Sequence, residues 1–211
     1  MRVINDIVNV NGTIQNKSIV PLKKPKDPRA DEGPASVVRH WIFRRLFMLH
    51  RISGDLTTLA GHFVLIQQVN CQNRMGAGLA LALMRRWPRI ANDYHGYCAG
   101  HTPEELFGHV QTSTLGDAQF VCNVFGQLNY GPRGHFTDEH ALLAACNRII
   151  HHAGQARLPV FVPANLGSGL AGGNAEQIQA GLAQAAQRWS ADVYLVDFVP
   201  NLFIAPRAYR A

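Results

Sequence analysis

Two glycine-rich segments have the residue types and spacing to hold an anion. The first is Asn70-Cys-Gln-Asn-Arg-Met-Gly-Ala-Gly-Leu79, and the second is Asn165-Leu-Gly-Ser-Gly-Leu-Ala-Gly-Gly173. Glycine has no Cβ atom, so the backbone can approach a ligand closely, adopt positive φ and aim its N–H groups at phosphate oxygens. A helix that begins directly after such a segment adds its positive N-terminal end. One segment of this kind predicts one anionic group, and two predict a diphosphate held between them.

Two other interpretations of these segments stay open at this point. Glycines also occur in tight strand-to-helix turns that bind nothing. The second segment formally matches the dinucleotide fingerprint G-x-G-x-x-G through Gly167, Gly169 and Gly172, with Asp197 at the end of the next strand-like stretch. Only 14 residues follow Asp197, which leaves no sequence for the remaining strands of a dinucleotide fold. Neither segment ends in the Gly-Lys-Ser/Thr of a P-loop.

The elements that must position these segments alternate between strand-like and helix-like stretches. Apolar, strand-like stretches cover residues 49–56, 62–69, 108–115, 120–125, 159–163 and 192–198. Helix-like stretches cover residues 79–87, 90–98, 138–153 and 175–189. Thr137 and Asn174 are suitable N-caps for the last two of these helices. The alternation predicts the α/β class, with a three-layer α/β/α domain around a central mixed sheet, in which ligands bind at the carboxyl ends of the strands.

The charge and composition of the chain divide it into three parts. We expect residues 1–47 to be a basic, poorly ordered extension rich in proline and lysine, residues 48–200 to form the domain, and residues 201–211 to be a C-terminal tail. A translation start at Met48, or a binding role for the basic extension, stays open. Of the net charge of +6, residues 1–50 carry +5, so the domain has no basic stripe for a nucleic-acid duplex.

Several other classes of protein are disfavoured by the composition. No apolar run reaches the length of a membrane span, so we expect no membrane partner. Cys71, Cys98, Cys122 and Cys146 have no zinc-site spacing and follow no secretory signal, so we expect reduced thiols in a cytoplasmic protein. We expect no metal ion and no cofactor.

Three motifs together resemble the macro domain family of ADP-ribose-binding modules. They are Ile52-Ser-Gly-Asp-Leu56, Val69-Asn70 before Met75-Gly-Ala-Gly78, and Pro163-Ala-Asn-Leu-Gly-Ser-Gly-Leu170. The similarity covers about residues 49–198 and is nearest to the branch of terminal ADP-ribose protein glycohydrolase and yeast ADP-ribose 1″-phosphate phosphatase. It implies a macro domain fold and, as partner, ADP-ribose or an ADP-ribosylated substrate. A nucleic acid would be a partner only if it carried ADP-ribose.

The resemblance also implies roles for single residues. Asp55 would accept a hydrogen bond from the adenine amino group beside the backbone of Leu56, and Asn70 would contact the distal ribose. Phe125 or Tyr130 would pack on the ligand near that ribose. The two glycine segments would each face one phosphate. The remaining implied ligand-binding residues are Met75, Gly76, Ala77, Gly78, Leu79, Gln127, Asn165, Gly167, Ser168, Gly169, Leu170 and Ala171.

Catalytic groups of the family are not matched in this sequence. Where one branch has a lysine nucleophile and its aspartate partner, this chain has Gln127 and Ala171, which cannot form or process a covalent sugar adduct. The chemistry left is a water oriented by the ligand's phosphate and by Asn70 or Asn73, with His135 as a weak candidate for the general base. The sequence therefore predicts either a hydrolase acting on ADP-ribose 1″-phosphate or on ADP-ribosyl groups of macromolecules, or a non-catalytic ADP-ribose-binding module.

Overall fold

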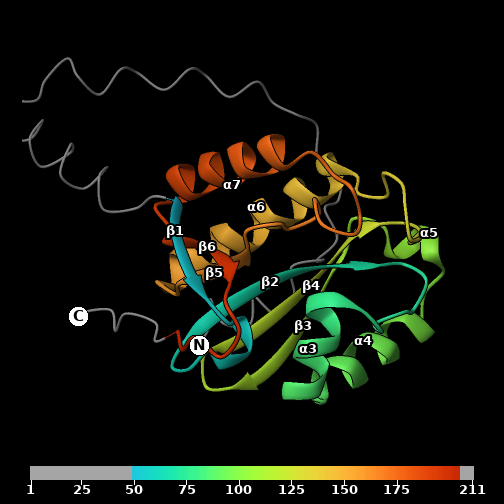
Figure 1. Ribbon diagram of the computed structural model, residues 1–211, viewed down its shortest axis with the longest axis horizontal. Coiled ribbons are helices and arrows are strands. Elements are labelled where there is room, and N and C mark those ends of the chain that lie inside the picture. The colour runs from blue at the N-terminus through green and yellow to red at the C-terminus, as the bar shows by residue number, and fades with distance from the viewer. Residues whose placement is uncertain (1–48, 205–211) are drawn as a thin grey trace, which may run out of the picture.

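The computed structural model describes residues 49–204, which form one mixed β-sheet with helices on both faces (Figure 1). The predicted extension, residues 1–47, lies outside the described residues. The strands are β1 (Leu49–Gly54), β2 (Phe63–Asn70), β3 (Val110–Gly116), β4 (Gln119–Gln127), β5 (Val160–Pro163) and β6 (Val193–Phe198). The helices are the 3₁₀ turn η2 (Leu56–Thr58), α3 (Gly78–Arg86), α4 (Arg89–Ala99), α5 (Pro103–Leu106), α6 (Glu139–Ala156) and α7 (Ala175–Trp189).

The strand order explains where a ligand site can form. The sheet has the order β1-β6-β5-β2-β4-β3. The first five strands in this order pair in parallel, whereas β3 pairs antiparallel with β4 as a hairpin. The carboxyl ends of β1, β6, β5, β2 and β4 therefore lie at the same edge of the sheet. This arrangement confirms the predicted α/β/α layers with a central mixed sheet.

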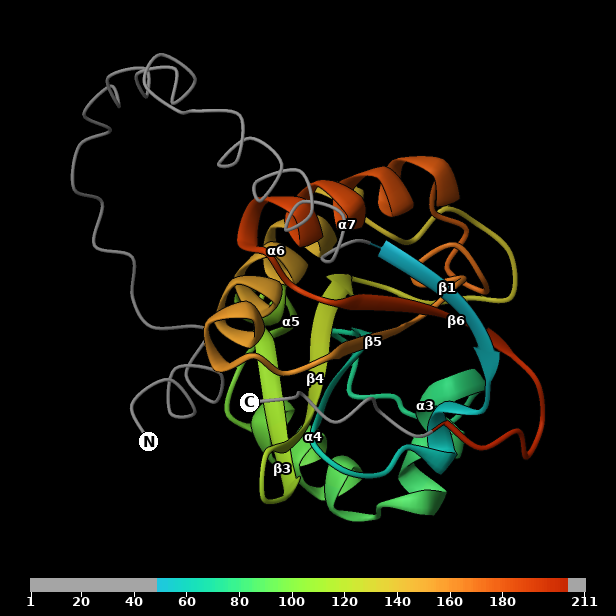
Figure 2. The same cartoon turned by 90° about the vertical axis from the view of Figure 1, so that its left-hand side faces the viewer.

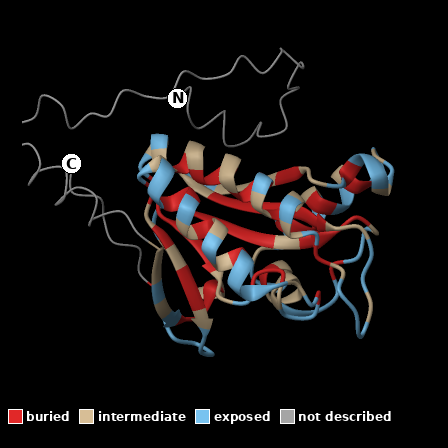
Figure 3. Cartoon of the chain, turned by 90° about the horizontal axis from the view of Figure 1, so that it is seen from above, coloured by how far each residue is buried: buried red, intermediate tan, exposed pale blue. Residues whose placement is uncertain are grey.

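Two apolar clusters hold the layers together, one on each face of the sheet. On β2, Val64 and Ile66 pack into the cluster under α6 and α7, whereas Phe63 and Leu65 pack into the cluster under α3 and α4. Side chains alternate between the faces of a strand, so a strand covered on both faces is apolar throughout. Figure 2 shows the two pairs of helices on opposite sides of the sheet. In Figure 3 the strands are buried and the helices expose their outer surfaces.

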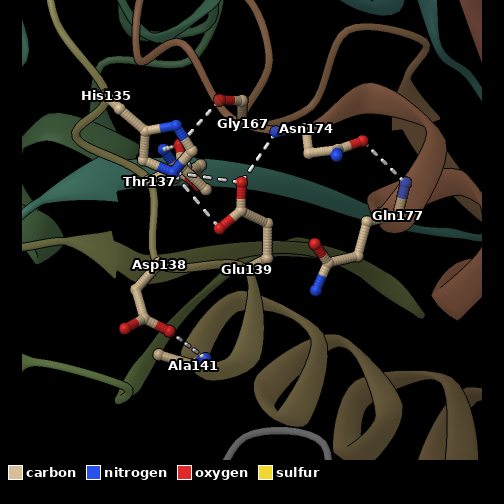
Figure 4. Close-up of polar contacts among 9 residues, drawn as sticks. His135, Thr137, Asp138, Glu139, Ala141, Gly167, Asn174 and Gln177 are labelled. Atoms are coloured by element: carbon tan, nitrogen blue, oxygen red, sulfur yellow. Dashed lines mark hydrogen bonds and ion pairs between the residues drawn. The ribbon is translucent and has the colours of Figure 1, made fainter.

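The start of α6 differs from the prediction. Its N-cap is Asp138, whose carboxylate accepts a hydrogen bond from the Ala141 N–H at 2.8 Å (Figure 4). Thr137, the expected cap, is buried, and its hydroxyl donates to the Gly167 carbonyl at 2.6 Å. The hydroxyl is thus committed to the second glycine segment and is not used as a helix cap. The predicted cap of α7 is confirmed, because Asn174 accepts a hydrogen bond from the Gln177 N–H at 3.1 Å.

The chain after β6 packs back on the domain. The Asp55 N–H donates to the Leu202 carbonyl at 2.9 Å, and the Ile204 side chain is 5% exposed. Ile204 fills the space above Gly54, where an added Cβ atom would come within 2.3 Å of it. The Leu202 carbonyl and the Ile204 side chain thus contact the end of β1, and the domain boundary at residue 200 stays a prediction. No helix among residues 49–204 is both long enough and apolar enough to cross a membrane.

Candidate functional site

A cavity of about 510 Å³ lies at the sheet edge where β2, β4 and β5 end. Both glycine segments line it, so the structure brings together the two groups on which the anion-site prediction depends. Gln67 and Gln68 of β2 and Pro163 of β5 also line the cavity. The sequence-predicted site residues in the lining are Asn70, Met75, Gly76, Ala77, Gly78, Leu79, Gln127, Tyr130, Asn165, Gly167, Gly169, Leu170 and Ala171.

Asn70 shapes the first glycine segment as the chain leaves β2. Its Oδ1 accepts hydrogen bonds from the N–H groups of Gln72 at 3.0 Å and Arg74 at 3.3 Å, and its Nδ2 donates to the Arg74 carbonyl at 2.7 Å. The Tyr94 hydroxyl donates to the Asn70 carbonyl at 2.9 Å. These bonds form an Asx-type turn that fixes where the segment enters the cavity. Contact of Asn70 with a ribose stays a prediction.

The first turn of α3 is open to the cavity. Its N-cap, Ala77, makes no side-chain capping bond, and the turn contains no acidic residue. Among residues 49–204 there is no acceptor for the N–H groups of Gly78, Leu79 and Ala80. By contrast, α6 and α7 are capped by Asp138 and Asn174. An uncapped helix start that faces a cavity is suited to binding an anion.

The second glycine segment is a tight turn held mainly by its own backbone. The N–H groups of Ser168 and Gly169 both donate to the Asn165 carbonyl at 3.1 Å. The N–H groups of Leu170 and Ala171 have no acceptor in the described part of the chain. Ser168 is therefore removed from the predicted phosphate contacts of this segment, because it lies outside the cavity lining and its N–H donates within the turn.

The two segments meet across the cavity at Leu170. This side chain is 70% exposed, and its Cδ1 lies 3.8 Å from the point that a Cβ atom on Gly78 would occupy. Gly78 itself has φ of +56°, which a residue with a side chain adopts only with strain. The lining contains no aspartate or glutamate, and Arg74 is its one charged side chain within the described residues. The charge of the cavity therefore favours an anionic ligand.

Asp55 and Leu56 lie outside the cavity lining. Leu56 is a core residue with 4% exposure. The Asp55 carboxylate caps η2, accepting from the Thr57 N–H at 2.9 Å and the Thr57 hydroxyl at 2.7 Å, and it also accepts from the Asn201 N–H at 3.1 Å. Burial raises the pKa of Asp55, but these hydrogen bonds outweigh burial, so its pKa is lowered. The carboxylate is thus ionised at neutral pH, and its contact with adenine stays a prediction.

Phe125 lies in the core and does not border the cavity. Its ring is 0% exposed and packs against Tyr94 and Tyr97, with ring centroids 5.8 and 5.9 Å away. On β4 it shares the face of Val121, so the alternation of the strand directs both side chains into the core under α3 and α4. Packing of Phe125 on a ligand was therefore the wrong expectation, whereas Tyr130 lines the cavity and is 53% exposed.

Two of the weak catalytic candidates also lie outside the lining. The Asn73 side chain is hydrogen-bonded to the His95 ring at 2.5 Å. The His135 ring Nε2 lies 3.2 Å from the Glu139 carboxylate, and the same glutamate accepts a hydrogen bond from the Asn174 N–H at 2.7 Å (Figure 4). The hydrogen bond from Asn174 lowers the pKa of Glu139 most, and His135 lowers it further. His135 therefore tethers the loop before α6 and does not face the cavity as a base.

Sequence reasoning missed four polar or aromatic lining residues: Gln67, Gln68, Arg74 and Phe136. A signal existed for the glutamines, because two polar residues interrupt the apolar run of β2 just before its carboxyl end. Such residues at that end of a parallel strand face the ligand edge of the sheet. No group of three or more His, Cys, Asp or Glu side chains that could hold a metal occurs within residues 49–204.

Comparison with known proteins identifies the fold. No family profile and no curated protein sequence matches this chain. A protein of unknown function from Bacteroides thetaiotaomicron superimposes with a TM-score of 0.65 at 22% identity, over 72% of this chain and 99% of that one. A macrodomain protein from Streptomyces coelicolor gives 0.56 at 21% identity, over 70% and 99% of the two chains. The macrodomain of Mycobacterium tuberculosis DarG gives 0.56 at 24% identity, over 73% and 99%.

These structures are matched over nearly their whole length by the described domain of this chain. The domain is therefore a three-layer α/β/α domain with an open mixed sheet. Its fold is the macrodomain fold, as the sequence resemblance implied.

Proposed function

We propose that this chain is a member of the macro domain family that binds ADP-ribose in the cavity between its two glycine segments. The observation that carries the proposal is the uncapped start of α3, which opens into a cavity whose described lining has no carboxylate. The N–H groups of Gly78, Leu79 and Ala80 would hold one phosphate, and those of Leu170 and Ala171 the other. The diphosphate would replace the acceptors that these N–H groups lack in the described residues.

The two ends of the ligand would lie on opposite sides of this diphosphate site. On one side, Phe198 is 71% exposed at the end of β6 and pairs in register with Gly54, directly before Asp55. Adenine would stack on this exposed ring and donate its amino group to the ionised Asp55 carboxylate. On the other side, Gln127 and Tyr130 would border the distal ribose.

Hydrolysis of an ADP-ribose derivative is the second candidate function. The resemblance to the hydrolase branch favours it, with ADP-ribose 1″-phosphate or an ADP-ribosyl group on a macromolecule as the substrate. The described lining, however, offers no carboxylate, lysine, histidine or cysteine side chain. Burial raises the pKa of the nearby Cys71 thiol to about 12, so this thiol is no nucleophile at neutral pH. Turnover would depend on a water oriented by amides and by the phosphate of the ligand.

Calorimetry with ADP-ribose, AMP and NAD tests the binding proposal. We expect ADP-ribose to bind more tightly than AMP, because AMP has no second phosphate for the second segment. Failure of ADP-ribose to bind at millimolar concentration would overturn the proposal. Incubation with ADP-ribose 1″-phosphate and with ADP-ribosylated protein then separates the two candidates. Product from either substrate supports a hydrolase, and tight binding without product leaves a binding module.

A further inference from the structure

A chain of hydrogen bonds connects the second glycine segment to Gln127 in the cavity. The Thr137 hydroxyl donates to the Gly167 carbonyl at 2.6 Å, as Figure 4 shows. The Gln68 side-chain Nε2 lies 2.9 Å from the same hydroxyl oxygen and 2.6 Å from Oε1 of Gln127. Thr137 is 2% exposed, so the middle of the chain is shielded from solvent. The chain therefore links the ends of β2 and β4 to the second segment.

The direction of this chain follows from its first bond. A backbone carbonyl can only accept, so the Thr137 hydroxyl donates its one hydrogen to the Gly167 carbonyl. The hydroxyl oxygen must then accept from Gln68, which requires that the amide nitrogen of Gln68 face it. The second hydrogen on that nitrogen is donated to Gln127, so the carbonyl oxygen of Gln127 faces Gln68. The orientation of each amide is thus determined by the network.

Packing around Gln68 leaves its amide group little room to move. Its Oε1 lies in a narrow space between two glycines, where a Cβ atom on Gly126 would approach it to 2.8 Å and one on Gly167 to 2.9 Å. A side chain at either position would displace the amide. The two glycines therefore leave room for the carbonyl end of Gln68 and hold it in place.

The amide nitrogen of Gln127 is consequently directed away from Gln68. One of its hydrogens is donated to the Asn129 carbonyl at 3.1 Å. Its second hydrogen has no acceptor among residues 49–204, and Gln127 lines the cavity. Gln127 pairs in register with Asn70, at the end of β4. Its free N–H thus lies at the sheet edge between the strand ends, and is separate from the first turn of α3.

We infer that Gln127 is a fixed N–H donor that selects ligands with an acceptor oxygen at this position, and that Gln68 and Thr137 are positioning residues that fix its orientation. This inference rests on the proposed binding of ADP-ribose. Because Arg74 is the charged residue of the described lining, which has no carboxylate, an anionic oxygen is the favoured acceptor. In an ADP-ribose derivative that carries a phosphoryl group on its distal ribose, a phosphoryl oxygen would be this acceptor.

The test compares the affinities of two probes, ADP-ribose and ADP-ribose 1″-phosphate, by calorimetry. Gln127→Met removes the donor without adding charge. We expect it to weaken binding of the 1″-phosphate about tenfold or more, as for a hydrogen bond to a charged group, and binding of ADP-ribose by a few-fold at most. Gln184→Met, at an exposed position on α7, is the matched control and should change neither affinity.

Thr137 variants test the positioning role through the ratio of the two affinities. Thr137→Val removes the hydroxyl that fixes Gln68, and we expect the preference for the 1″-phosphate to fall. Thr137→Ser keeps the hydroxyl and should restore the preference, which a purely structural role would not explain. Equal losses for both probes in Gln127→Met, or an unchanged ratio, would overturn the inference. If the wild-type chain binds neither probe, the proposed function itself is wrong, and that outcome is distinct.

Discussion

Gly76 is the position where an added methyl group tests the cavity with little effect on the fold. It lies in the cavity lining, its φ is not in the left-handed region, and an added Cβ atom would meet nothing within 4 Å. Gly76→Ala should therefore be neutral or raise the free energy of unfolding by about 0.4–1 kcal/mol, because alanine restricts the unfolded chain. The methyl group would instead occupy space that a phosphate needs.

The expected loss of affinity follows from the contacts that the methyl group would block. Displacing the phosphate from one N–H group of the α3 start removes a hydrogen bond to a charged group, which costs about 1.5–3 kcal/mol. This corresponds to roughly 10- to 150-fold weaker binding of ADP-ribose. Calorimetry measures the affinity, and urea unfolding measures the stability of the same preparation.

Gly96→Ala is the matched control for this experiment. Gly96 is exposed on α4, and an added Cβ atom there also meets nothing within 4 Å. This change should raise the free energy of unfolding by about 0.5–1 kcal/mol, the difference in helix propensity, and should leave the affinity unchanged. If Gly76→Ala binds ADP-ribose as tightly as the wild type does, the assignment of the first segment to a phosphate is refuted.

Three further substitutions probe the scaffold of the site. Gly167→Ala should lower the free energy of unfolding by about 2–4 kcal/mol in urea titration, since the methyl group would contact Leu142 at 2.8 Å and φ is +66°. Asp138→Ala should lower it by about 1 kcal/mol through loss of the α6 cap, whereas Asp138→Ser, which keeps a side-chain oxygen at the cap, should retain most of it. Because the folded-state pKa of Asp55 is lowered, its ionised carboxylate stabilises the fold above the unfolded pKa of about 4, and this stability is lost as pH falls through the folded pKa. Asp55→Asn should therefore make the melting temperature depend less on pH in the acid range.

The fold could be predicted from the sequence because its signals are local. The apolar runs of β2 and β5, the Asn174 cap and the glycine segments each specify a nearby element. Details that depend on distant contacts could not be predicted. The β3–β4 turn, Asp117-Ala118, places Ala118 at φ of 50° although it is not a glycine.

The candidate site could be predicted in its backbone and less well in its side chains. Glycine spacing alone identified the two segments that line the cavity. The direction of the Phe125 ring depends on which face of β4 meets α4, and the role of Thr137 depends on a carbonyl 30 residues away. Neither can be determined from neighbouring residues. Gln68 was missed because its function arises from two partners on other elements, Gln127 and Thr137.

The uncapped start of α3 links the stability of one helix to the occupancy of the cavity. In α6 and α7 a side chain of the protein itself satisfies the first turn, and in α4 the N–H groups of Ile90 and Ala91 donate to the backbone carbonyls of the preceding turn. In α3 that task is left to whatever anion occupies the cavity, so ligand binding and ordering of residues 76–80 become one equilibrium. Amide protons there would exchange with solvent fastest in the empty protein and slow down as the site fills. The exchange rates of these α3 amides would thus measure the occupancy of the cavity, without any movement of the sheet.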